Sequence, residues 1–383
     1  MIVYYSCASL TKGLAGLSLF LSSHHWYSMN HSGTDGLAEW KAVIARYQGA
    51  DARRAIGQMI NTLVPLAVVM CLMYLSLGRV SYWLTLLLVP LAAGLLVRTF
   101  IIMHDCAHGS FFRSKRANAI VGWITGVLTV TPFERWRHSH ALHHASSGDL
   151  TRRGNGDVDT LTMREYANLS RWGRLKYRVL RNPFILFGIG PLHFMIDNRI
   201  PPKGARFRGK EARGVWTTNL ALAAIVIGVS AWLGWRAFVL TYLPAMYLAA
   251  AGGIWLFYVQ HQFEDTYWQD HGTWDYATAA IRGSSYFRLP KVLDWFTGSI
   301  GLHHVHHLGP RIPNYRLKQV HDENPMFHDV TTLTIASSVR TLRLALWDEE
   351  GEELVSFREA KRRRLERRAT VTDFSDVRVR EPA

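Results

Sequence analysis

Cysteine is scarce in this 383-residue chain, which contains only Cys7, Cys71 and Cys106. None of the three lies in a CxxC pair, so the sequence argues against both a disulfide framework and a thiolate-bound metal. If the chain holds a metal, we therefore expect its ligands to be nitrogen or oxygen atoms.

Charged residues are also few, at 19% against 49% hydrophobic residues, and 44 Lys and Arg outnumber 29 Asp and Glu. A basic balance alone would suggest nucleic-acid binding. The apolar residues, however, gather in a few long blocks, which is typical of membrane proteins. We therefore expect no nucleic-acid partner, and we expect the net charge of +15 to face anionic headgroups at the cytoplasmic surface.

Four apolar blocks are long enough to cross a bilayer, since about 20 helical residues at roughly 1.5 Å each cover its hydrocarbon core. The expected spans are 56–77, 81–103, 215–234 and 238–259. Only a few residues separate the first span from the second and the third from the fourth. The sequence therefore predicts two helical hairpins, and two shorter apolar stretches, 119–130 and 184–196, are expected to be interfacial or buried helices.

Positive charge gives the expected orientation. Each short hairpin link contains one arginine, Arg79 or Arg236, whereas the segment 104–213 contains nineteen Lys and Arg. The positive-inside rule then places both termini and this segment in the cytoplasm. The basic run KRRRLERR near the C-terminus is interpreted as a solvated or membrane-surface face, with docking of an acidic electron donor as the alternative.

These features predict an all-α integral membrane protein with four transmembrane helices and a cytoplasmic helical cap. The expected parts are an N-terminal tail at 1–39, a membrane domain at 40–328 and a basic cytoplasmic tail at 329–383. The run LAGLSLFL within residues 1–28 is too short to span a membrane and lacks a convincing cleavage site. We expect these residues to be a loose tail, and a chain starting at Met29 to keep its activity.

Histidine motifs lie at the expected cytoplasmic ends of these spans. HDCAH follows the second block directly, and WRHSHALHH and GLHHVHHL each contain the spacing HxxHH. Both spacings place imidazoles on one face of a helix. QHQFED places one further histidine at the end of the fourth block. The candidate metal ligands are His104, His108, His140, His143, His144, His261, His303, His306 and His307.

Nine imidazoles are too many for one metal, which takes about four ligands in a zinc site, and they suit two. The Glu and ExxH pattern of carboxylate-bridged di-iron bundles is not visible. Imidazole binds Zn, Cu, Fe and Ni, so ligand type alone does not name the metal. For His261 a helix-end hydrogen bond is the alternative role, and we expect His138 and His304 to point away from the ligands.

For three further side chains near the motifs, the sequence indicates only a general role. His193 is expected to be a core histidine, because it lies within an apolar stretch. Asp105 and Asp157 are either hydrogen-bond partners of the ligands or residues of helix caps and turns.

With these motifs assembled, the sequence resembles the membrane fatty acid desaturases. HDCAH, HALHH and HHVHH are similar to the three histidine boxes of that family. Outside the boxes, YQGADARRAIGQMINTLVP, VLRNPFILFGIGP, FYVQHQFEDTYW and GLHHVHHLGPRIPNYRL resemble the bacterial acyl-lipid branch. The resemblance covers roughly residues 40–321 of the chain.

The resemblance implies a di-iron centre that uses O2 to introduce a cis double bond into a fatty acyl lipid, with delta-12 or omega-6 as a candidate position. The eight box histidines match as iron ligands by motif, and His261 matches by its place before FED. No haem-binding HPGG sequence occurs, so an external electron carrier such as ferredoxin is expected. Membrane lipids are further partners, and the bacterial inner membrane, with a cytoplasmic active site, is the expected location.

Two alternatives stay open. Related di-iron membrane hydroxylases and ketolases, acting on alkanes, lipids or carotenoids, share the boxes and the first hydrogen abstraction. A metal-binding membrane scaffold or transporter belongs to another class. Against it, the four spans contain almost no ionisable residues at mid-depth, where an ion path would need them.

Overall fold

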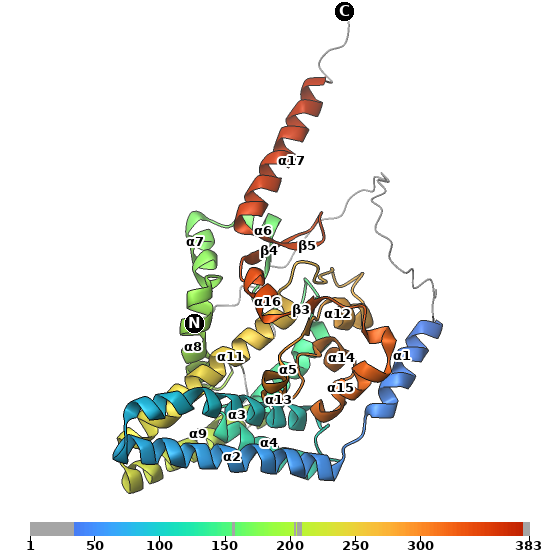
Figure 1. The fold of residues 1–383 in the computed structure, drawn as a ribbon. Helices are drawn as coiled ribbons and strands as arrows, with labels where there is room; N and C mark the ends of the chain where they lie inside the picture. The colour runs from blue at the N-terminus through green and yellow to red at the C-terminus, as the bar shows by residue number, and fades with distance from the viewer. Residues whose placement is uncertain (1–33, 155–157, 203, 205–208, 378–383) are drawn as a thin grey trace, which may run out of the picture. The chain divides into compact units, whose positions relative to one another are not determined.

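A computed structural model describes residues 34–154, 158–202, 204 and 209–377 (Figure 1). The chain divides into two units, 1–42 and 43–383. In the first unit only the beginning of α1 (Thr34–Tyr47) is described. The expectations for residues 1–28 and for a start at Met29 therefore lie outside the described residues.

Among its described residues, the second unit contains four helices long and apolar enough to cross a membrane, as predicted, and the bent pair Arg171–Leu180 and Ile185–Asp197 would count as a fifth if it formed one span. They are α2 (Ala52–Arg79), α3 (Tyr82–His108), α9 (Lys210–Leu233) and the continuous segment Trp235–His261. The last of these comprises α10 (Trp235–Ala237), the π-helix η2 (Phe238–Tyr242) and α11 (Leu243–His261). α2 and α3 lie side by side as a hairpin in Figure 1.

Local sequence sets the ends of the first hairpin. The Asp51 carboxylate accepts hydrogen bonds from the backbone N–H groups of Arg53 and Arg54 and caps α2. Ser81 caps α3 in the same way. α3 ends at Gly109, whose φ of 68° is the left-handed conformation that glycine adopts without strain. The helix therefore continues five residues past the predicted end, and both histidines of HDCAH lie on it.

α2 has one face toward lipid and one toward protein. Exposed apolar side chains recur every three or four residues from Ile56 to Leu75, while Leu66, Val69 and Met73 are buried against the other spans. Because lipid is as apolar as a protein core, an exposed apolar face is stable there. Arg98 of α3 is the exception among these apolar surfaces. It is buried, donates to Thr62 and to the Trp295 carbonyl oxygen, and so stays out of the lipid.

Short helices form the cap between and after the hairpins. Before α9 these are α4 (Lys115–Leu128), α5 (Phe133–Ser146), α6 (Met163–Asn168), α7 (Arg171–Leu180), the π-helix η1 (Ile185–Ile189) and α8 (Gly190–Asp197). After α11 they are α12 (Tyr276–Arg282), α13 (Lys291–Phe296), α14 (His303–Leu308), α15 (Asn314–Glu323), the 3₁₀ helix η3 (Pro325–Phe327) and α16 (Ile335–Thr341).

Two small sheets join segments far apart in sequence. β1 (Leu161–Thr162) pairs in parallel with β4 (Leu344–Asp348), which pairs antiparallel with β5 (Glu353–Ser356). β2 (Tyr286–Phe287) pairs in parallel with β3 (Thr332–Leu333). The sequence analysis predicts none of these strands. The fold is nevertheless mainly helical, as predicted.

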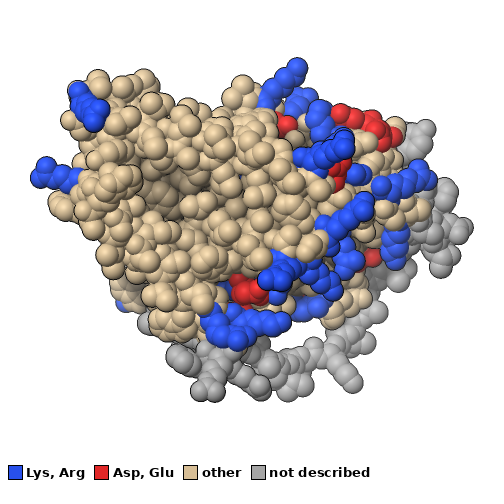
Figure 2. Space-filling model, turned by 90° about the horizontal axis from the view of Figure 1, so that it is seen from below, with Lys and Arg blue, Asp and Glu red and all other residues tan. Residues whose placement is uncertain are grey.

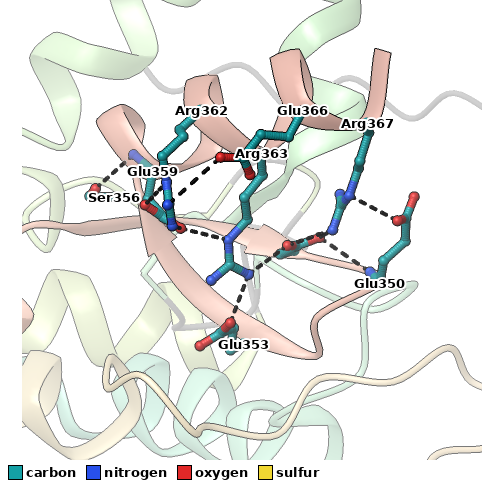
Figure 3. Close-up of polar contacts among 9 residues, drawn as sticks. Glu350, Glu353, Ser356, Glu359, Arg362, Arg363, Glu366 and Arg367 are labelled. Atoms are coloured by element: carbon teal, nitrogen blue, oxygen red, sulfur yellow. Dashed lines mark hydrogen bonds and ion pairs between the residues drawn. The ribbon is translucent and has the colours of Figure 1, made fainter. Parts of the chain in front are cut away.

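The segment predicted as a basic C-terminal tail contains packed structure. α17 (Phe357–Val377) follows β5 and extends from the β4–β5 hairpin in Figure 1. Its first turns are tied to that hairpin by ion pairs (Figure 3). Asp348, whose side chain is fully buried, accepts from Arg363 at 2.8 Å and from Arg367 at 2.9 Å. Arg363 also contacts Glu353 and Glu359.

Candidate metal centre

The nine predicted histidines converge from four helices. α3 ends with the HDCAH pair, α5 contains the HALHH motif, α11 ends at His261 and α14 begins at His303. In each of two groups, one potential ligand atom per side chain lies within 4.8 Å of all the others. The first group is His104, His108, His140, His144 and His306, and the second is His143, His261, His303 and His307.

Close contacts between Nε2 atoms define the first group. His306 Nε2 lies 3.1 Å from His104 Nε2 and 3.0 Å from His144 Nε2. His144 Nε2 is also 3.1 Å from His140 Nε2. Nitrogens about 2.1 Å from one ion and about 90° apart would be separated by roughly 3.0 Å, so this spacing suits ligands of a single metal.

The second group has the same spacing. His261 Nε2 lies 3.2 Å from His143 Nε2 and 3.0 Å from His303 Nε2. His307 Nε2 is 3.1 Å from His303 Nε2. The groups are neighbours, because the rings of His144 and His307 stack with centroids 4.2 Å apart.

The HxxHH motifs bridge the two groups. On α5, His140 and His144 belong to the first group and His143 belongs to the second. On α14, His306 belongs to the first group, and His303 and His307 belong to the second. Side chains on one helix face thus divide between two neighbouring positions. The sequence predicts the shared face and the two-metal count, but it does not predict this division.

Burial keeps the imidazoles of the cap neutral. The pKa values of His140, His144, His303, His306 and His307 lie well below the usual 6.5, chiefly because burial disfavours the charged ring. Neighbouring imidazoles lower these pKa values further. A neutral ring has a free lone pair, which is the form that binds a metal.

Hydrogen bonds at Nδ1 orient two of the rings and leave their Nε2 atoms facing the groups. His104 Nδ1 lies 3.0 Å from Oδ1 of the buried Asp105, and His261 Nδ1 lies 2.9 Å from the Gly283 carbonyl oxygen. Oδ2 of Asp105 accepts from the backbone and side-chain nitrogens of Asn314, at 2.6 and 2.8 Å. Asp105 therefore connects the first histidine motif with the segment that follows the third.

The remaining polar residues of the sequence analysis lie outside both groups. His304 is fully buried, with Nε2 3.1 Å from the Phe327 carbonyl oxygen, and burial lowers its pKa to about 3. His138 is exposed and lies 3.7 Å from Glu211. His193 is exposed on α8, so its prediction as a core histidine is wrong: α8 turns that face away from the protein. Asp157 lies outside the described residues.

Several residues around the centre were not predicted. The Trp136 ring stacks on His140 at 4.2 Å, and Phe257 lies beside both His143 and His261. Tyr276 donates to the His307 carbonyl oxygen at 2.6 Å. Trp136 and Phe257 each precede a histidine by four residues, a helical spacing visible in the sequence. Tyr276 is 31 residues from its partner, and no sequence signal indicates the contact.

The donor set suits a transition metal. Both groups consist of imidazoles alone, and Nε2 of His108 is buried without a hydrogen-bond partner among the described residues. Buried polar atoms normally have partners, so a metal would satisfy this nitrogen. Imidazole is compatible with several first-row metals, and the geometry does not choose among them.

Comparisons with known proteins agree with this site. The family model described as fatty acid desaturase matches residues 81–331, which include all nine histidines. A protein from Bacillus subtilis (strain 168) named fatty acid desaturase is 46% identical over 319 residues, or 83% of this chain and 90% of that protein.

More distant relatives match over shorter lengths. A Synechocystis protein named sn-1 acyl-lipid omega-3 desaturase (ferredoxin) is 29% identical over 57% of this chain and 61% of its own length. A Vigna radiata omega-3 fatty acid desaturase of the endoplasmic reticulum is 32% identical over 57% of this chain and 58% of its own length. The chain thus matches less than two thirds of these two relatives.

Proposed function

Because the chain belongs to the fatty acid desaturase family, we propose that it uses O2 and two histidine-bound iron ions to introduce a cis double bond into a fatty acyl chain. Family membership makes it an oxidoreductase and confirms the resemblance seen in the sequence. The observation that supports the proposal best is the division of nine imidazoles, all buried or partly buried, into two adjacent groups of metal-ligand geometry.

In this proposal each group holds one iron. Iron would supply the redox chemistry needed to remove hydrogen from an unactivated methylene, which zinc lacks. The nine imidazoles present Nε2 lone pairs, and Asp105 and the Gly283 carbonyl hold two rings in the required orientation through Nδ1. The ligand side chains of α14 are almost fully buried, which keeps bulk water from the reacting atoms.

The overall reaction requires electrons from outside. Two hydrogens leave the acyl chain, and with two further electrons and two protons they convert O2 to two waters. The chain has three cysteines, fewer than the four thiolates that usually hold an iron–sulfur cluster. We propose that a ferredoxin-type carrier supplies the electrons, since the name of the Synechocystis relative includes ferredoxin.

The proposed substrate is an acyl chain of a membrane lipid. Two Synechocystis relatives are named sn-1 acyl-lipid omega-3 desaturase and sn-1 oleoyl-lipid 12-desaturase, and the four membrane helices of the present chain give a lipid substrate access from the bilayer. The proposed location is a bacterial inner membrane, with the histidine groups on the cytoplasmic side. The Lys and Arg residues near these groups support that orientation.

Expression in a host without desaturases tests the proposal. We expect new cis-unsaturated chains in lipid extracts by gas chromatography–mass spectrometry, and about two irons per purified chain. The position of the double bond identifies the regiospecificity. Hydroxylated or keto products without unsaturation would contradict desaturation, and a chain that binds metal but consumes no O2 would contradict an enzymatic role.

A further inference from the structure

α7 exposes an apolar stripe on the side opposite its buried face. Tyr177 faces inward and is 4% exposed, whereas Trp172, Leu175 and Val179 are 68%, 50% and 46% exposed. Spacings of three and four residues place these three side chains on one helix face. None of the described residues covers this stripe enough to bury it, so its side chains would be more stable against an apolar surface outside the described residues.

Cations flank the stripe on both sides. At about 100° per residue, Arg171 and Arg178 lie along one edge and Lys176 along the other, and all three are exposed. Arg178 donates to the hydroxyl of Tyr166, which keeps its guanidinium near the helix surface. An apolar stripe between basic edges is typical of helices that lie in the plane of a membrane surface.

The stripe continues into a second exposed apolar surface beside a membrane span. After the Asn182–Pro183 break, the segment η1–α8 is bent by 60° from α7. Its inner side packs against α11, where Tyr247 donates to the Gly188 carbonyl oxygen at 2.9 Å. Its outer side exposes Phe184 at 87% and Ile196 at 63%. Figure 1 shows α7 followed by α8, and α8 lies beside α11, the last part of a membrane span.

We propose that α7 lies in the interface of the cytoplasmic leaflet and binds anionic phospholipid headgroups. In this arrangement Trp172, Leu175 and Val179 enter the boundary of the acyl region, and Arg171 and Lys176 reach the phosphates, while Arg178 stays on Tyr166 and Phe357. An acidic soluble protein would also match the cations. It would not match an apolar stripe that continues into the lipid-facing side of α8, so a lipid surface is the better fit.

The inner side of α7 connects this surface to the metal centre. Tyr177 donates to the Ala345 carbonyl oxygen at 2.6 Å. Arg181, the C-cap of α7, donates to Oε1 of Gln262 and to the Leu344 carbonyl oxygen, both at 2.8 Å. Gln262 directly follows His261. A lipid-bound α7 therefore stabilises the segment that positions one histidine of the second group.

A depth measurement on the full chain tests the proposal. An environment-sensitive fluorophore is attached at Leu175→Cys, in a variant whose three native cysteines are alanine and whose iron content and activity are checked first. Phe184→Cys is the lipid control and Glu352→Cys the water control. The protein is reconstituted into vesicles of phosphatidylcholine alone, or with about one quarter phosphatidylglycerol.

In the anionic vesicles, quenching by nitroxide-labelled lipid should reach position 175 as it reaches 184, and an aqueous quencher should reach only 352. Arg171→Glu with Lys176→Glu should return the fluorophore to water, because each lost cation weakens headgroup binding about fivefold. A fluorophore at position 175 that stays in water in both vesicles overturns the proposal. If added ferredoxin then shields that fluorophore from the aqueous quencher, α7 is a protein-docking face instead. Equal lipid depth in both vesicles and in the double variant overturns the anionic preference. Desaturation is measured on the same samples, so neither failure alters the proposed function unless activity is also missing.

Discussion

A single turn of α14 separates ligand candidates from a buried neighbour of the same type. His303, His306 and His307 belong to the two groups, whereas His304 turns away and contacts the Phe327 carbonyl oxygen. All four are buried, so exposure does not distinguish them. The direction of each side chain does, because adjacent helical positions differ by about 100°.

Alanine substitutions at these four positions should therefore differ in effect. His303→Ala, His306→Ala and His307→Ala each remove an Nε2 donor and should abolish desaturation and lower the iron content. His304→Ala removes an outer contact and should lose about 10- to 100-fold in activity. Unsaturated chains and iron per protein are measured at matched expression. Full activity in any of the first three variants would refute the ligand assignment, and equal inactivity of all four would refute the argument from helix faces.

Asp105 supports a ligand from outside the two groups. Its carboxylate accepts from three donors, one at Oδ1 and two at Oδ2, if His104 carries its proton on Nδ1. An amide would turn an NH2 group toward one of these donors. Asp105→Asn should therefore weaken iron binding by about 10- to 100-fold.

A titration of iron into the metal-free protein measures this effect. Asp51→Asn is the matched control, because it is the same chemical change at the α2 cap, where the remaining oxygen still accepts from the backbone N–H groups of Arg53 and Arg54. The control should bind iron as the unmodified chain does. Unchanged iron affinity in Asp105→Asn would show that the carboxylate does not orient His104.

At the scale of elements, the sequence predicts what periodicity and motif spacing can encode. The four spans follow from their apolar length, and the helix on HHVHH follows from its spacing. Span ends are less well predicted, because α3 continues from the apolar block into the cap until Gly109 ends it. A capping glycine is visible in the sequence only once the helix is known to reach it.

Other elements depend on contacts that local sequence does not contain. β1 and β4 are two and five residues long and lie more than 180 residues apart, so neither has a recognisable pattern by itself. Likewise, the convergence of His261 with HALHH and HHVHH requires the packing of α11 against the cap. The motifs indicate that the histidines share a function, and the fold determines which of them share a metal position.

α17 provides a prediction at this scale. Burial works to raise the pKa of the Asp348 carboxyl, but hydrogen bonds from Arg363 and Arg367 outweigh it and hold the pKa below its usual 3.8. A carboxyl whose folded pKa is depressed stabilises the folded state above the unfolded pKa. We therefore expect the attachment of α17 to hold at neutral pH and to weaken as the pH falls below about 4.

Asp348→Asn should have the same effect at neutral pH, with a local loss of roughly 1.5–3 kcal/mol, because two arginines lose a charged acceptor. Hydrogen exchange of residues 357–367 should become faster while the iron content stays unchanged. Glu366→Gln is the control, since its partner Arg362 and Glu366 itself are exposed and such pairs contribute little. Slow exchange in Asp348→Asn would mean that the other contacts of α17, such as the pair of Arg363 with Glu353, hold it without the Asp348 carboxylate.

At the scale of the second unit, charge and apolar surface are separated along the membrane helices. Figure 2 shows a broad surface without charged side chains, with many Lys and Arg at one end and few at the other. Arg79 and Arg236 are exposed at the hairpin links, while the cap contains most of the remaining cations. From the positive-inside rule we propose that the histidine groups face the cytoplasm, where a soluble electron carrier can reach them.

Single exposed cysteines test this orientation in cells. In cells whose outer membrane is permeabilised and whose inner membrane is intact, a membrane-impermeant maleimide should label Arg79→Cys and Arg236→Cys. Both links are expected on the outer face of the inner membrane. Arg116→Cys in the cap and Arg358→Cys on α17 should be labelled only after the inner membrane is permeabilised. The chain without added cysteines controls for Cys71, which is exposed on a span and should not meet an aqueous reagent. Labelling of Arg116→Cys in intact cells would reverse the proposed topology, and it would place the histidine groups where no cytoplasmic carrier could reduce them.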